Sequence, residues 1–154
     1  LGLIHHPMNT TITTLLEQKG GGVYTIPSTV TVAEAVQEMN MRKVGSVLVM
    51  NGLRLAGIFT ERDVLRRVVG ASLDPELTPI AKVMTVDVLT VEPSATVQEV
   101  MDIFTEKRCR HLPVMQAGRL VGVISIGDVS RWVANLHRAE AESLRQYIAG
   151  GLST

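Results

Sequence analysis

Along the chain, segments with the hydrophobic spacing of strands alternate with segments that have the spacing of helices. The same succession of segments occurs twice. In the first half, apolar runs typical of strands occupy residues 23–26, 46–50 and 55–60. The helical spacing of Val32, Val36 and Met39 predicts a helix between the first two runs. In the second half the corresponding strands are expected at 88–91, 111–115 and 120–125, and the helix carries Val97, Val100, Met101 and Phe104. A second helix follows each third strand, so the order β-α-β-β-α, twice, predicts an α/β (α+β) fold.

The two halves are copies of one sequence. An offset of 65 residues aligns 23–69 with 88–134 without gaps, and 14 of these 47 positions are identical. The identities include Thr31/Thr96, Glu34/Glu99, Gly57/Gly122 and Asp63/Asp128. We call these segments the first copy and the second copy. A segment of this length cannot bury enough surface alone, so the two copies are expected to pack together.

Less regular segments flank the copies. The segment before the first copy predicts a short helix at 11–18, which Gly20–Gly22 would end. Pro75 and Pro79 mark a linker with one helical turn at 80–84, and a long helix is expected at 129–149. The expected organisation is a leader with a short helix (1–22), the first copy (23–70), a linker (71–87), the second copy (88–134) and a helical extension (135–154).

Composition narrows the class of protein. Fifteen Lys and Arg balance fifteen Asp and Glu, which argues against a nucleic-acid partner. No apolar run reaches the roughly 20 residues that cross a membrane, and because the first residues lack a signal-peptide pattern, secretion is not expected. The single Cys109 excludes an internal disulfide framework, so a cytoplasmic protein is expected. We interpret His5 and His6 as a remnant or an irregular leader rather than as a metal site.

Each third strand ends in the same signature, Gly57-Ile-Phe-Thr-Glu-Arg-Asp63 and Gly122-Val-Ile-Ser-Ile-Gly-Asp128. One interpretation is a capping box that only satisfies free N–H groups at the start of a helix. The other is a nucleotide site, in which the helix start and the hydroxyl of Thr60 or Ser125 meet a phosphate. The Asp side chain would then accept hydrogen bonds from the two ribose hydroxyls. Because the signature is duplicated in register, we favour the nucleotide site.

These residues resemble the CBS domain, a family named after cystathionine β-synthase. The β-α-β-β-α repeat ends in Gly-h-h-Thr/Ser-x-x-Asp (h, hydrophobic), and two such repeats in tandem form a Bateman module. The chain is similar to stand-alone bacterial CBS pairs, which often carry the turn Thr-Glu-Arg-Asp (here 60–63) and the strand Arg-His-Leu-Pro-Val (here 110–114). The resemblance implies a pseudo-twofold pair with two clefts between the copies. It also implies AMP, ADP, ATP or NAD(H), and in some members S-adenosylmethionine, as ligand.

The resemblance also implies which residues hold that ligand. Asp63 and Asp128 would hold the riboses, and Thr60 and Ser125 would meet the first phosphate. The adenine would lie against the end of the first strand and the entry of the second, at Thr25, Ile26, Val44, Gly45 and Ser46 in one copy and at Thr90, Val91, Arg110, His111 and Pro113 in the other. Arg62 lies within reach of a phosphate, whereas the second turn has Gly127 there, so equal affinity of the two clefts is not expected.

The leading hypothesis is therefore a regulatory adenine-nucleotide sensor, in which ligand shifts the packing of the copies and an effector protein reads the shift. A ligand-free dimerisation scaffold is the alternative. An enzyme is the third reading, and we find no catalytic residues or metal cluster that would support it. The apolar face of 129–148, with Trp132 and Tyr147, indicates a homodimer.

Overall fold

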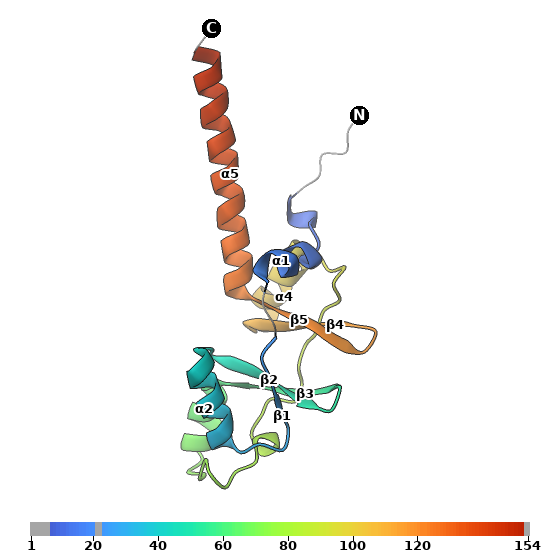
Figure 1. Ribbon diagram of the computed structural model, residues 1–154, viewed down its shortest axis with the longest axis vertical. Helices are drawn as coiled ribbons and strands as arrows, with labels where there is room; N and C mark the ends of the chain where they lie inside the picture. The colour runs from blue at the N-terminus through green and yellow to red at the C-terminus, as the bar shows by residue number, and fades with distance from the viewer. Residues whose placement is uncertain (1–6, 21–22, 153–154) are drawn as a thin grey trace. The chain divides into compact units, whose positions relative to one another are not determined.

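The computed structural model describes residues 7–20 and 23–152, and its contacts divide these residues into two compact units (Figure 1). The copy-1 unit contains residues 23–90 together with 115–122. The copy-2 unit contains residues 7–20, 91–114 and 123–152. Each unit combines helices with paired strands, so the α+β class expected from the sequence is confirmed.

The copy-1 unit is built on a three-stranded sheet of order β1-β2-β3, in which β1 runs parallel and β3 antiparallel to β2. Its elements are β1 (Thr25–Pro27), α2 (Val32–Arg42), β2 (Ser46–Asn51), β3 (Arg54–Thr60), α3 (Glu61–Asp63), the π-helix η2 (Val64–Val69) and the 3₁₀-helix η3 (Ile80–Lys82). Helix α2 lies against this sheet (Figure 1), and Val32, Ala35 and Met39 point into the core. The sequence prediction rested on Val32, Val36 and Met39, and Val36 is partly buried against the same core.

The copy-2 unit repeats the pattern with fewer strands. Its elements are the 3₁₀-helix η1 (Pro7–Asn9), α1 (Ile12–Lys19), α4 (Val97–Lys107), β4 (His111–Gln116), β5 (Arg119–Ser125) and α5 (Ile126–Leu152). The strand expected at 88–91 is wrong, because only Val91 pairs, through one parallel bridge to Val114. The amide of Val91 donates to the carbonyl of Pro113. In the first copy Leu48 N also donates to Tyr24 O, but the equivalent of Leu48 is Pro113, which has no N–H for that bond.

Each copy is completed by a segment that lies outside the 47-residue repeat. In the copy-1 unit, Ile80 N donates to Val30 O and Val32 N to Thr78 O, which fastens the segment around η3 to the start of α2. The copy-2 unit repeats this pattern, in which Ile12 N donates to Ala95 O and Val97 N to Thr10 O. Ile80 and Ile12 are both fully buried. The segment expected to be a linker therefore supplies part of one core, and α1 supplies part of the other.

Capping of α2 and α4 differs in completeness. Thr96 and Glu99 form both bonds of a capping box, as their spacing predicts. Thr31 accepts the bond from Glu34 N, and no return bond from the Glu34 side chain is present. Among the helices of the described residues, none is long and apolar enough to cross a membrane.

Ile80 allows a direct test of the role of the linker. We expect Ile80→Ala to lower the free energy of unfolding by about 2–5 kcal/mol, because it opens a cavity in a closed core. Leu77→Ala removes a similar side chain that is 79% exposed, and it should change stability by less than about 0.5 kcal/mol. Urea unfolding of both variants makes the comparison, and equal stabilities would show that 78–85 is not part of the core.

Candidate functional site

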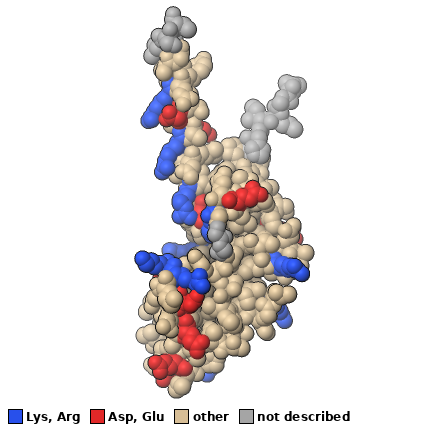
Figure 2. All heavy atoms as spheres, in the orientation of Figure 1, with Lys and Arg blue, Asp and Glu red and all other residues tan. Residues whose placement is uncertain are grey.

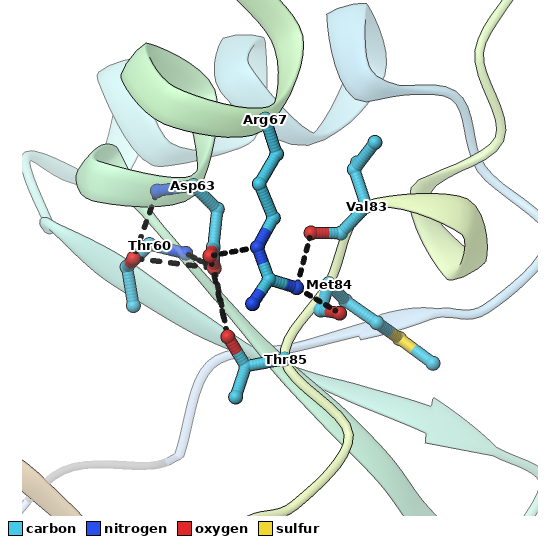
Figure 3. Close-up of polar contacts among 6 residues, drawn as sticks. All are labelled: Thr60, Asp63, Arg67, Val83, Met84 and Thr85. Carbon is cyan, nitrogen blue, oxygen red and sulfur yellow. Dashed lines mark hydrogen bonds and ion pairs between the residues drawn. The ribbon is translucent and has the colours of Figure 1, made fainter. Parts of the chain in front are cut away.

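The turn after β3 holds a buried carboxylate. Thr60 N donates to Asp63 Oδ2 over 3.0 Å, and Asp63 N donates back to Thr60 Oγ1 over 3.2 Å (Figure 3). These two bonds are the capping box that the sequence allows, and they leave Asp63 only 6% exposed. A buried carboxylate needs partners for both oxygens, so the remaining contacts of Asp63 decide what else the turn can do.

The partners of the other Asp63 oxygen come from 67 and 85. Thr85 Oγ1 donates to Asp63 Oδ1 over 3.2 Å, and Arg67 Nε lies 3.6 Å from the same oxygen. Arg67 also donates through Nη1 to the carbonyl of Met84 over 3.1 Å, as Figure 3 shows. The segment that follows the first copy is thus bound to the turn of that copy. Thr85 also pairs with Ile58 in an antiparallel bridge, in which the backbone N–H of each residue donates to the carbonyl of the other.

The turn after β5 has the same reciprocal bonds with different partners. Ser125 N donates to Asp128 Oδ2 over 2.9 Å, and Asp128 N donates to Ser125 Oγ over 3.1 Å. Lys19, the last residue of α1, places its Nζ 2.9 Å from Asp128 Oδ2, and the Arg131 guanidinium pairs with Oδ1. Asp128 is 8% exposed. Its charge is therefore balanced by two cations, one of them from another element.

Two groups at this turn, Asp128 and His111, have pKa values shifted from their ordinary values. Burial alone would raise the pKa of Asp128, but hydrogen bonds from Lys19 and Ser125 outweigh it, and the pKa is lowered. The pKa of His111 is lowered by burial first, and then by the positive charges of Lys19 and Arg110, against the opposing effect of Asp128. The turn thus favours a charged Asp128 and a neutral His111.

Only some of the other binding residues predicted for the first copy lie next to its turn. Ser46 pairs with Thr60 across the sheet, and Gly45 O accepts from Glu61 N over 3.0 Å, so Gly45 and Ser46 border the turn. Val44 is half-buried and donates its N–H to Met39 O. Thr25 and Ile26 form β1 and pair with β2. Arg62 is exposed.

In the second copy, the structure brings only some predicted residues to the turn. Arg110 O accepts from Ile126 N over 3.0 Å, and His111 is within the field of Asp128. Pro113 is buried inside β4, and its carbonyl accepts from Val91. Thr90 is exposed and lines a groove of about 600 Å³ with Leu53, Arg54, Leu55, Val86, Val88, Met115 and Gly118.

Sequence reasoning missed the residues that hold the carboxylates. Lys19 and Thr85 lie outside the aligned copies, so the offset of 65 could not reveal them. Arg67 and Arg131 follow their Asp by four and three residues, and this helical spacing was the available signal for both pairs. The packing of the copies about a pseudo-twofold axis, and the clefts between them, remain predictions.

No group of three or more His, Cys, Asp or Glu side chains that could hold a metal ion occurs within 7–20 and 23–152. His5 and His6 lie outside the described residues. Throughout the same ranges, every buried side-chain nitrogen or oxygen has a hydrogen-bond partner. The carboxylates of both turns are therefore already hydrogen-bonded, so a ligand that binds them competes with existing partners.

Comparison with known proteins identifies the repeat. The model of the family described as the CBS domain matches residues 21–70 and again residues 80–135. The chain belongs to the CBS-domain family. Both matched segments contain one of the two turns with a buried Asp, so the tandem CBS pair that the motifs suggested is confirmed.

Relatives of this CBS pair cover most of its length. A CBS domain-containing protein of Arabidopsis thaliana, named CBSX3, mitochondrial, is 36% identical over 93% of this chain and 74% of its own. A solved CBS-domain-containing protein of Agrobacterium tumefaciens is 36% identical, with a TM-score of 0.74 over 79% of this chain and 98% of its own. A CBS domain protein of Pyrobaculum aerophilum, solved in complex with AMP, is 28% identical, with a TM-score of 0.69 over 77% and 89%.

His111 should make stability depend on pH. Its lowered pKa means that the unfolded chain binds the proton more readily, so its stabilising contribution is present above about pH 6.5 and is lost as the pH falls. We expect the free energy of unfolding to fall more steeply between pH 6.5 and 5 in the parent protein than in His111→Gln. Chemical denaturation at stepped pH measures this. Identical slopes would show that His111 keeps the same proton affinity in both states.

Proposed function

We propose that this CBS pair is a regulatory sensor of adenine nucleotides, namely AMP, ADP, ATP or NAD(H). Ligand would bind at the turns of Asp63 and Asp128, change how the two copies pack, and be read by an effector protein. The observation that carries the proposal is the duplicated turn, in which each copy buries one carboxylate at the end of a strand. The AMP complex of the Pyrobaculum aerophilum relative supports an adenosine compound as the ligand.

The chemistry of each turn suits a nucleotide. A charged carboxylate can accept hydrogen bonds from two vicinal hydroxyls, and charge-assisted bonds are the stronger class. The lowered pKa of Asp128 keeps that group ionised at neutral pH. The start of a long helix, here α5, is the positive end of the helix dipole, which favours a phosphate beside the ribose. We propose binding rather than catalysis, in the cytoplasm.

The alternative function is a dimerisation scaffold that binds no ligand. Specific observations favour it too, because Asp63 and Asp128 each complete a reciprocal cap and have their oxygens bonded. In a scaffold, the carboxylates would serve only the starts of α3 and α5. The two functions differ in what they predict for a variant that loses the carboxylate charge but keeps the cap. Nucleotide binding should weaken in a sensor, whereas a scaffold has no binding to lose.

Asn substitutions separate the two functions, because an Asn side chain still accepts a bond at a helix start. We expect Asp63→Asn and Asp128→Asn to weaken nucleotide binding at their own copy by roughly 10- to 100-fold, the worth of a hydrogen bond to a charged group. Calorimetric titration with AMP, ADP, ATP and NAD(H) measures the effect on protein stripped of small molecules. A parent protein that binds none of these at millimolar concentration supports the scaffold instead.

A matched control shows what loss of a cap alone does. Thr96→Ala removes the cap of α4, which lies outside both turns, and it should cost about 1 kcal/mol of unfolding free energy. Nucleotide affinity should stay unchanged in this variant. If the two Asn variants bind nucleotide as tightly as Thr96→Ala does, the carboxylates are caps and the sensor function is wrong.

We further propose that α5 forms part of a homodimer. Leu144, Tyr147 and Ile148 are 60%, 81% and 52% exposed, and their spacing of three and four residues places them on one face of the helix. Arg131, Arg138 and Arg145 follow at intervals of seven residues on another side of α5, and Figure 2 shows Lys and Arg atoms along this helix. The exposed apolar face supports a second copy of the helix as its partner.

Light scattering tests the dimer. The parent protein should give about twice the 16.7 kDa mass of one chain at tens of micromolar. Leu144→Glu combined with Tyr147→Glu should shift it to a monomer, because each change places a charge in the apolar face. Glu142→Lys reverses a charge on the opposite side of α5 and should leave the dimer intact. A dimer that survives the double change must use another surface.

A further inference from the structure

The cation that holds Asp128 comes from outside the repeat and has no counterpart in the first copy. Lys19 Nζ donates to Asp128 Oδ2 and to the carbonyl of Val123, each over 2.9 Å. At the first turn, the partner that arrives from a neighbouring segment is the neutral hydroxyl of Thr85, 3.2 Å from Asp63. Two carboxylates at equivalent positions therefore face an ammonium in one copy and a hydroxyl in the other.

Other charged residues also make the surroundings of the second turn more positive than those of the first. Beside Asp128, Arg110 and His111 open β4, and the charges of Lys19 and Arg110 both act on His111. The equivalent positions in the first copy are Gly45 and Ser46. There the carboxyl of Glu61 comes within 3.5 Å of the place that a Cβ on Gly45 would occupy. Each Asp pairs with one arginine, Arg67 or Arg131, and beyond that pair the second turn has Lys19 and Arg110 nearby, whereas the first has Glu61 beside Gly45.

We propose that Lys19 makes the second turn selective for phosphorylated ligands over uncharged nucleosides. This inference rests on the proposed function, because it concerns ligand choice at the same turn. A ribose that takes the Asp128 carboxylate must displace Lys19, which leaves an ammonium that has lost its counter-charge. A phosphate on the same ligand replaces that counter-charge, whereas an unphosphorylated nucleoside does not.

The position of Lys19 suits this exchange. Its side chain is 39% exposed and flexible, whereas the side chain of Asp128 is 6% exposed and also fixed by Ser125. The ammonium therefore moves at lower cost than the carboxylate. Arg131 keeps a cation at the other oxygen of Asp128 when Lys19 turns toward a phosphate. At the first turn Arg67 pairs with Asp63 as Arg131 pairs with Asp128, but Thr85, in the place of Lys19, carries no charge to be rebalanced.

The test compares AMP with adenosine by calorimetry in an Asp63→Asn background, which leaves the second turn as the intact one. The background protein should prefer AMP. Adding Lys19→Met should reduce the ratio of the two affinities by roughly 10- to 100-fold, the worth of a charge-assisted bond. Lys19→Arg should restore the preference, because it keeps the charge. As the matched control, Thr85→Val in an Asp128→Asn background should leave the corresponding ratio unchanged at the first turn.

The outcomes separate this inference from the proposed function. An unchanged ratio in Lys19→Met, with apo unfolding showing a folded protein, overturns the role of Lys19 and leaves the sensor intact. If the Asp63→Asn protein binds neither compound while Asp128→Asn still binds AMP, the second turn is not a nucleotide site, and the inference is wrong. If the unsubstituted protein binds no nucleotide, the proposed function fails and the inference with it. If Lys19→Met does not fold, the failure of Lys19→Arg to keep the preference overturns the inference.

Discussion

A buried carboxylate must be given partners for its charge, and this constraint organises both halves of the protein. Asp63 and Asp128 lie almost out of solvent, where an unpaired charge costs several kcal/mol. The backbone of each turn supplies part of the compensation through a reciprocal cap. The remainder comes from an arginine shortly after each Asp, Arg67 or Arg131, and from a residue distant in sequence, Thr85 in one unit and Lys19 in the other. The same carboxylates thus cap a helix and fasten a neighbouring segment.

The fastened segments also close the cores, so turn chemistry and packing depend on each other. Thr85 follows Ile80, Val83 and Met84, which are buried with the sheet of the first copy. Lys19 ends α1, whose Ile12 and Leu15 are buried with α4 and the β4-β5 pair. A ligand that competes for either carboxylate therefore acts on a segment that is part of a hydrophobic core. This connection gives a physical route from binding to a change in packing.

The sequence predicted most of the local structure, because local periodicity and the repeat were sufficient for it. The positions of β2 to β5, α2 and α4 follow from strand and helix spacing. Duplication was the reason to favour a nucleotide site over an ordinary cap at Asp63, and that site stays a prediction. The features that the sequence predicted wrongly or missed are those that depend on tertiary contacts. Residues 88–90 have strand-like composition and find no strand to pair with, since Val91 alone bonds to the Pro113 carbonyl. Lys19 and Thr85 meet their carboxylates only after folding, so no spacing revealed them.

Each core includes a segment from outside its own 47-residue repeat, and this affects the order in which the two cores can form. Residues 78–85 follow the first copy directly, so the core of that copy needs only chain that lies close by. The core of the second copy needs α1, and the bond from Ile12 to Ala95 spans more than half of the chain. Closing so large a loop is slow relative to local contacts. During synthesis, α1 emerges first and must wait, with Ile12 and Leu15 exposed, until α4 and β4 exist to cover them.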